Sequence, residues 1–136
     1  YWNLPEFTAI SGFAPDAVLI KLGTNDSKPQ NWQHGAELEG DLRAMIAHFR
    51  QLPSRPGIWL CLPVPVYETK WGINDAVVKD RIIPIIAKVA DAQNVPVIDL
   101  NEALAGKPEC FPDKIHPNAA GARLMAETVA GALTGK

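Results

Sequence analysis

Three short apolar runs, at residues 17–22, 58–62 and 95–100, constrain the fold of this 136-residue chain more than any other feature. Each run has the length of a buried strand, and turn or proline signals lie beside it. All three are apolar on both faces, as are the strands of a parallel sheet that helices cover. The runs therefore predict three strands of a buried parallel sheet.

Helical patterns occupy the segments between these runs. Residues 74–93 begin at Asn74, a suitable N-cap, and contain Pro84, which predicts a kink or a break. Residues 36–52 form the other helical segment and end before Pro53. Its apolar stripe at i, i+3 and i+4 spacing consists of Leu38, Leu42, Met45, Ile46 and Phe49. The stripe on residues 74–93 consists of Val77, Val78, Ile82, Ile85, Ile86 and Val89.

A third helix is predicted over residues 117–133, with Pro117 in its first turn. Strands and helices then alternate along the chain, which predicts an α/β fold with right-handed crossovers. The length and the hydrophobic content of 47% fit one domain over residues 1–136. We expect the buried face of the last helix to include Ala120, Leu124, Thr128 and Leu133.

The charge distribution argues against two classes of partner. Thirteen Lys and Arg residues stand against fifteen Asp and Glu residues, and the formal net charge is −2. No basic patch or charge run stands out, so we expect neither nucleic acid nor an anionic membrane to be bound. The apolar stretches are also far shorter than the roughly 20 residues that a membrane-spanning helix needs.

The first apolar run continues into the sequence LGTND, at residues 22–26. Gly23 allows a backbone turn that other residues resist, and Asn25 would project an amide from the carboxyl end of a strand. Such an amide can donate a hydrogen bond to a developing oxyanion during acyl transfer. The alternative is an Asx turn, in which Asn25 and Asp26 bond only to the local backbone. The NDS sequon at this turn is a poor glycan acceptor, because it packs against a strand end.

The sequence PDKIHP, at residues 112–117, places Asp113 three residues before His116. A histidine that acts as a general base needs one ring nitrogen held by a partner, and a nearby carboxylate can hold it. The alternative is that Asp113 caps a turn and His116 caps the start of the following helix. A metal site would need further ligands, and His34 and His48 show no ligand pattern. We therefore expect no metal and no cofactor.

Cys61 and Cys110 do not form a C-x-x-C pair. Both are expected near the same end of the sheet, so two interpretations remain open: two buried, reduced thiols, or a single disulfide. A disulfide would require an oxidising compartment. We favour a secreted or periplasmic location, although no targeting segment is visible.

Two blocks together resemble the SGNH hydrolases, also called the GDSL esterase and lipase family. The blocks are DAVLIKLGTNDSKPQNW, at residues 16–32, and FPDKIHPNAAGARLMA, at residues 111–126. The resemblance covers essentially the whole chain and implies a flavodoxin-like three-layer α/β/α sandwich, here its last three strands and their helices. The stretches SKPQNW and VPVYETKWGI resemble the branch that contains carbohydrate and sialate O-acetylesterases.

The resemblance implies a role for each matching residue. His116 would be the base that deprotonates the nucleophile, and Asp113 would orient it. Asn25 would donate to the oxyanion, with Gly23 shaping the turn. The family's nucleophilic serine lies in a G-D-S block that this sequence lacks, and the serines present are Ser11, Ser27 and Ser54.

These observations favour a serine-type ester hydrolase that acts on a small acyl ester of a carbohydrate, most readily an acetyl ester. The nucleophile would lie on an N-terminal segment or on a second chain, and this chain alone would be inactive. Trp32, Tyr67 and Trp71 could line a sugar site, or could instead be core or loop-anchoring aromatics. Two other functions remain open. One is a non-catalytic interaction subunit that pairs through an open sheet edge at residues 17–22. The other is a small-molecule binding module, although no Gly-rich phosphate loop supports it.

Overall fold

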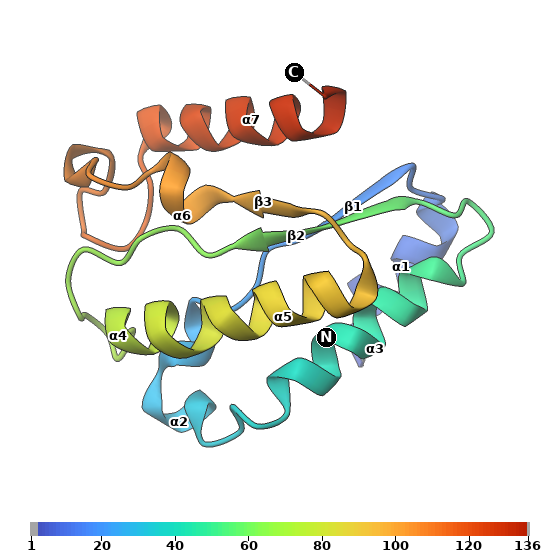
Figure 1. Cartoon of the computed structure of the whole chain (residues 1–136), viewed down its shortest axis with the longest axis horizontal. Coiled ribbons are helices and arrows are strands. Elements are labelled where there is room, and N and C mark those ends of the chain that lie inside the picture. The colour runs from blue at the N-terminus through green and yellow to red at the C-terminus, as the bar shows by residue number, and fades with distance from the viewer. Residues whose placement is uncertain (1–2, 136) are drawn as a thin grey trace.

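The structure is a computed structural model, and it describes residues 3–135. Within that range, three parallel strands form one sheet in the order β1-β2-β3 (Figure 1). The strands are β1 (Ala17–Ile20), β2 (Gly57–Leu62) and β3 (Val97–Asp99). The prediction of three parallel strands is confirmed. The first strand ends two residues earlier than predicted, and the third is shorter at both ends.

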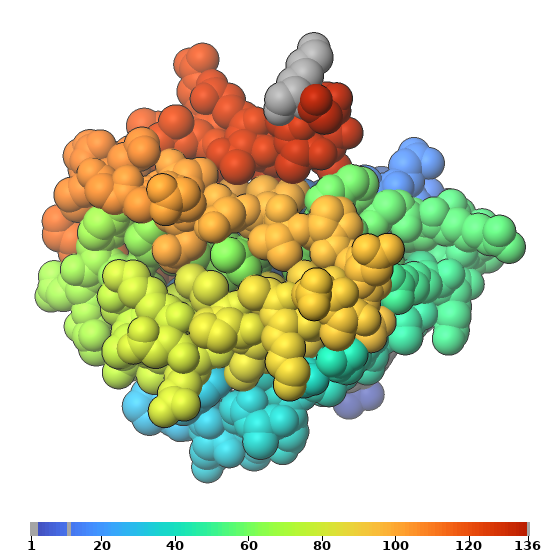
Figure 2. All heavy atoms as spheres, in the orientation of Figure 1, coloured from blue at the N-terminus to red at the C-terminus, as the bar shows by residue number. Residues whose placement is uncertain are grey.

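Helices cover both faces of the sheet, which confirms the three-layer α/β/α arrangement. One face carries α3 (Leu38–Arg50) and α5 (Ile83–Gln93), and α1 (Pro5–Phe13) lies beside α3. The other face carries α7 (Ala119–Thr134), which packs on β3 and on α6 (Leu100–Ala103). The space-filling view shows α5, the helix that precedes β3, packed between β3 and α3 (Figure 2). None of the helices within residues 3–135 is both long and apolar enough to cross a membrane.

The larger part of the core lies between the sheet and the α3–α5 layer. The predicted stripe of α3 is confirmed in full, because all five of its residues are buried: Leu38, Leu42, Met45, Ile46 and Phe49. They pack with inward-facing strand residues such as Ile20, Ile58 and Leu60. A smaller cluster lies on the α7 side of the sheet.

The helical segment predicted over residues 74–93 is continuous but not regular. It consists of α4 (Asp75–Val77), the π-helical segment η2 (Val78–Ile82) and α5. Asn74 caps it as predicted, and its side chain accepts a hydrogen bond from the Val77 amide. Pro84 has no amide hydrogen and crowds the preceding turn. The disturbance that Pro84 predicts therefore takes the form of a widened helical turn just before it, where the Ile83 amide bonds to the Val78 carbonyl.

The last helix differs from its prediction at the N-terminus and on its buried face. Asn118 is the N-cap and accepts a hydrogen bond from the Gly121 amide at 3.0 Å, so Pro117 lies before the helix and not in its first turn. Leu124 and Thr128 are partly buried, but Ala120 and Leu133 are exposed. The helix rests on the β3 side of the sheet, so part of its expected buried face meets no neighbour among the described residues.

Strand β1 has a hydrogen-bonded neighbour on one side only, within the part of the chain that the structure describes. Leu19 is 36% exposed, and it lies opposite Trp59 on the α7 side of the sheet. An apolar cavity of about 450 Å³ extends along the strand, between side chains of α1, β1 and α3. The predicted open edge at residues 17–22 is therefore present and is bordered by apolar surface.

Candidate functional site

The carboxyl ends of the three parallel strands meet at one edge of the sheet, on the left in Figure 1. Strand β1 leads into the turn that holds Gly23 and Asn25. Strand β2 leads into the loop at residues 63–73, and β3 leads through α6 to the loop that holds Asp113 and His116. Because parallel strands end together, every segment with predicted chemistry lies at this end of the fold.

Asp113 and His116 form a direct pair. Oδ2 of Asp113 lies 2.8 Å from Nδ1 of the His116 ring. A carboxylate only accepts hydrogen bonds, so Nδ1 donates and Nε2 is left as the nitrogen that can take up a proton. Oδ1 of Asp113 accepts from the backbone amides of His116 at 2.7 Å and of Ile115 at 2.9 Å. Asp113 therefore closes a turn and holds the imidazole at the same time.

These contacts shift the titration of the carboxyl group. The His116 backbone amide, the His116 ring and the Ile115 amide, in that order, stabilise the charged form and hold the pKa of Asp113 well below its usual range. The side chain of His116 is 68% exposed, and that of Asp113 is 34% exposed. The imidazole is thus open to an incoming group while its partner stays ionised at neutral pH.

Tyr67 fixes the loop that holds this pair. Its hydroxyl donates to the Leu104 carbonyl at 2.6 Å and accepts from the Lys107 amide at 2.8 Å. Its own amide donates to the Lys114 carbonyl at 2.9 Å, and its ring lies 5.1 Å from that of Phe111. Tyr67 therefore anchors the loop, which was one of the two interpretations left open for it. Tyr67 lies far from these partners in the sequence, so no local pattern predicts that it anchors the loop.

The turn after β1 depends on Gly23. Its φ is +119°, a region that other residues rarely adopt, and a Cβ there would come within 2.7 Å of Cγ2 of Ile82. Asn25 follows in a short 3₁₀ turn, η1 (Asn25–Ser27), and is exposed. The Asn31 side chain donates to the Asn25 carbonyl at 2.7 Å, which holds the backbone of the turn.

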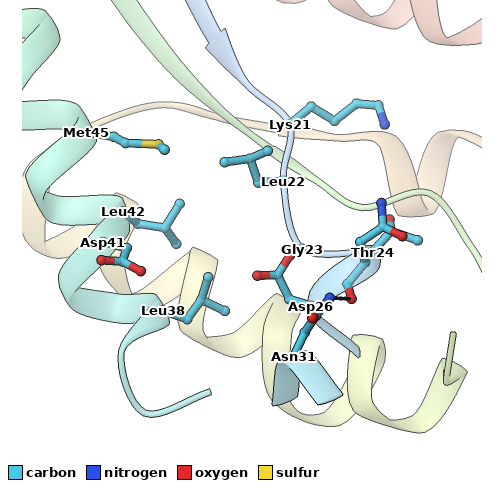
Figure 3. Close-up of a pocket in the computed structure, with 11 residues that line it drawn as sticks. Lys21, Leu22, Gly23, Thr24, Asp26, Asn31, Leu38, Asp41, Leu42 and Met45 are labelled. Atoms are coloured by element: carbon cyan, nitrogen blue, oxygen red, sulfur yellow. Dashed lines mark hydrogen bonds between the residues drawn. The ribbon is translucent and has the colours of Figure 1, made fainter. Parts of the chain in front are cut away.

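A cavity of about 400 Å³ adjoins this turn, between the end of β1 and α3. Figure 3 shows Asp26 and Asp41 directed toward the space between the turn and the helix. The apolar part of its lining comes from α3 and includes Leu38, Leu42 and Met45. It lies on the side of β1 that has no neighbouring strand among residues 3–135.

Ser27 has the wrong environment for a nucleophile. It is 1% exposed, and its hydroxyl donates to the Thr24 carbonyl at 2.7 Å. The same hydroxyl accepts from the Asn74 amide at 3.0 Å. Both functions of the hydroxyl are thus occupied by backbone groups, and the residue ties the turn after β1 to the start of α4.

The loop that follows β2 connects the two predicted halves of the site. At its end, the Asn74 amide bonds to Ser27, close to Asn25. Three residues earlier, the ring of Trp71 lies 5.9 Å from that of His116, centroid to centroid. Trp71 is therefore the expected sugar-site aromatic that contacts the pair. The third such residue, Trp32, instead packs against the core and against Gly35.

The two cysteines are buried in the same cluster and are free thiols in the structure. This is the first of the two interpretations left open for them, and the disulfide is not formed. Burial raises the pKa of the Cys61 thiol, which keeps it protonated and unreactive. Among residues 3–135, no group of three His, Cys, Asp or Glu side chains is arranged to hold a metal ion.

Comparison with known proteins gives a consistent result. The sequence profile of the GDSL-like Lipase/Acylhydrolase family matches residues 2–124. An acetylxylan esterase from Xylanibacter ruminicola is 40% identical over 151 residues, which include 98% of this chain and 32% of that protein. A multidomain esterase from Ruminococcus flavefaciens is 25% identical over 122 residues, covering 87% of this chain and 15% of that protein. The chain thus spans a third or less of these curated relatives.

Solved structures share the fold. A lipase/acylhydrolase from Enterococcus faecalis superimposes with a TM-score of 0.77 at 22% identity, covering 95% of this chain and 68% of that one. An acetylxylan esterase from Geobacillus stearothermophilus superimposes with a TM-score of 0.67 at 20% identity, covering 88% of this chain and 60% of that one. Part of each solved structure therefore has no counterpart in these 136 residues.

Proposed function

The chain belongs to the GDSL-like lipase/acylhydrolase family, and we propose that it supplies the general base and one oxyanion donor of a serine-type ester hydrolase. The observation that carries this proposal is the 2.8 Å contact between Nδ1 of His116 and the Asp113 carboxylate. It fixes the tautomer that a histidine base needs, at an exposed position beside the carboxyl ends of the strands.

In the proposed reaction, Nε2 of His116 takes the proton of a serine hydroxyl as its oxygen attacks the acyl carbon. The carbonyl oxygen becomes an oxyanion, and the side-chain amide of Asn25 donates a hydrogen bond to it. His116 then gives the proton to the leaving alcohol oxygen, and the acyl group stays on the serine. Water, deprotonated by His116, attacks the acyl carbon of this acyl-enzyme. The bond to the serine oxygen then breaks, His116 returns the proton to that oxygen, and the acid is released. Asp113 stays ionised throughout and holds Nδ1–H.

The proposed substrate is an acetylated carbohydrate. Support comes from the 40% identity to an acetylxylan esterase over nearly the whole chain. The exposed aromatic ring beside His116 also suits a sugar. An acetyl group on a xylan-type backbone is the ester that fits both observations, and no cofactor is needed for this reaction.

The nucleophilic serine is proposed to lie on a G-D-S segment that packs along β1. This strand is a sheet edge in the described part of the chain, with an exposed apolar side chain and an apolar cavity beside it. Open edges of this kind recruit another strand. The same observation is what favours the second candidate function, a non-catalytic subunit that pairs through β1 without hydrolysing an ester.

Reconstitution distinguishes the two functions. The chain is mixed with a separately supplied segment that contains the G-D-S block, and release of acetate from an acetylated xylo-oligosaccharide is measured. We expect turnover only in the mixture, with its loss in His116→Ala. His34→Ala is the matched control, because His34 is an exposed histidine whose ring bonds to the nearby Glu37, away from the site. Binding of the segment without any acetate release would support the non-catalytic function instead.

A further inference from the structure

The turn that presents Trp71 has an unusual backbone. Residues 70–73 form a tight turn, in which the Ile73 amide donates to the Lys70 carbonyl at 2.9 Å and the Lys70 amide donates to the Ile73 carbonyl at 3.3 Å. Both central residues have positive φ, +52° at Trp71 and +81° at Gly72. Such a turn is normally made with Asn-Gly or Asp-Gly, because a bulky side chain at positive φ is strained. A tryptophan here costs stability that an asparagine would not.

Packing does not explain this residue. Trp71 is 56% exposed and belongs to neither hydrophobic cluster, whereas Ile73, two residues later, is 3% exposed and is part of the core. Backbone strain of this kind is more common at functional sites than elsewhere. The exposed Trp71 ring is therefore a candidate contact for a bound molecule.

The ring is held in a fixed place. Ile73 anchors one end of the turn in the core, and a Cβ added at Gly72 would come within 3.6 Å of Pro29. Nζ of Lys70 lies 4.7 Å from the ring centroid, within reach of a cation–π contact. The ring lies 5.9 Å from the imidazole of His116, with the two planes at 37°. A rigid aromatic surface thus borders the proposed base directly.

The position of the Trp71 ring beside His116 indicates which part of the substrate it would contact. In the proposed reaction, His116 protonates the oxygen of the leaving alcohol, so the alcohol must lie beside His116 and the acyl group must lie beside Asn25. We propose that Trp71 is the residue that determines selectivity for the alcohol, by providing an aromatic surface on which the sugar ring of an acetylated xylo-oligosaccharide packs. The inference rests on the proposed function of the Asp113–His116 pair, and it makes Trp71 irrelevant to the choice of acyl group.

Two esters that share the acetyl group but differ in the alcohol test this inference. The reconstituted enzyme is assayed for kcat/KM on acetylated xylotriose and on ethyl acetate, whose alcohol is too small to cover the ring. Trp71→Asn removes the ring and suits the positive φ, so the variant should fold and show a higher Tm than the parent. Trp71→Tyr keeps an aromatic surface. Leu133→Ala is the control, because Leu133 is an exposed apolar residue on α7, 40% exposed, and lies neither in the site nor along β1.

For Trp71→Asn we expect kcat/KM on acetylated xylotriose to fall about tenfold, as for loss of a good aromatic contact. The value for ethyl acetate should stay unchanged, Trp71→Tyr should recover most of the loss, and Leu133→Ala should affect neither ester. Equal losses on both esters, or no loss on either, would overturn the inference and leave the proposed function standing. Failure of the reconstituted parent to hydrolyse either ester would overturn both.

Discussion

Replacing Tyr67 with phenylalanine removes one oxygen atom and keeps the ring against Phe111. The lost hydroxyl makes two hydrogen bonds, to the Leu104 carbonyl at 2.6 Å and from the Lys107 amide at 2.8 Å. Each intramolecular hydrogen bond contributes about 0.5–1.5 kcal/mol, and the two backbone groups would lose their partner together. The Tyr67 hydroxyl is only partly buried, so water can replace part of the lost hydrogen bonding. We therefore expect Tyr67→Phe to lower the free energy of unfolding by about 1–2 kcal/mol.

Urea unfolding of the parent and the variant, monitored by circular dichroism, measures this difference. The loop held by Tyr67 contains Asp113 and His116, so we also expect kcat of the reconstituted enzyme to fall while KM for ethyl acetate stays nearly constant. A variant whose unfolding midpoint matches that of the parent would refute the assignment of Tyr67 as the anchor of this loop. A kcat equal to that of the parent would show that the loop holds Asp113 and His116 in place without the Tyr67 hydroxyl.

Two further predictions concern Gly23 and the pH dependence of stability. Gly23→Ala should lower the free energy of unfolding by roughly 1–3 kcal/mol, because the backbone is at φ +119° and the new Cβ would meet Ile82. A thermal melt of the parent and the variant checks this loss of stability. The folded pKa of Asp113 lies below its unfolded value, so its contribution is complete above about pH 4 and is lost as the pH falls through the lower, folded pKa. Urea unfolding of the parent and of Asp113→Asn should therefore differ at pH 6 and converge in strong acid, and a difference that grows toward low pH would contradict the sign.

Local patterns in the sequence predicted the parts of the fold that depend on local burial. The stripe of α3 is one example, because apolar residues three and four apart must share a face of a helix. Asn74 is another, since an N-cap bonds within its own turn. Helix α1 was not predicted, because residues 5–13 have only a weak apolar stripe and their packing depends on α3.

Long-range contacts account for what sequence reasoning missed at the site. The pairing of Asp113 with His116 was predictable because the two residues lie three apart in one loop. Tyr67 and Trp71 meet this loop only when β2 and β3 bring the chain together, so their separate roles left no local signal. The sequence identifies both as aromatic residues of a loop that follows a strand. It does not show that Tyr67 anchors the loop and that Trp71 is exposed.

Asp113→Asn tests, with almost no change in shape, whether the Asp113 carboxylate holds His116 as the base of an ester hydrolase. The Oδ1 atom can still accept from the amides of Ile115 and His116, so the turn is kept. The new amide nitrogen cannot accept from Nδ1, and the imidazole is driven toward the wrong tautomer. The decisive measurement is kcat for acetylated xylotriose in the reconstituted enzyme. We expect a fall of about 10⁴-fold, the size seen when a triad carboxylate is replaced by its amide. A fully folded Asp113→Asn enzyme with kcat within about threefold of the parent would contradict it.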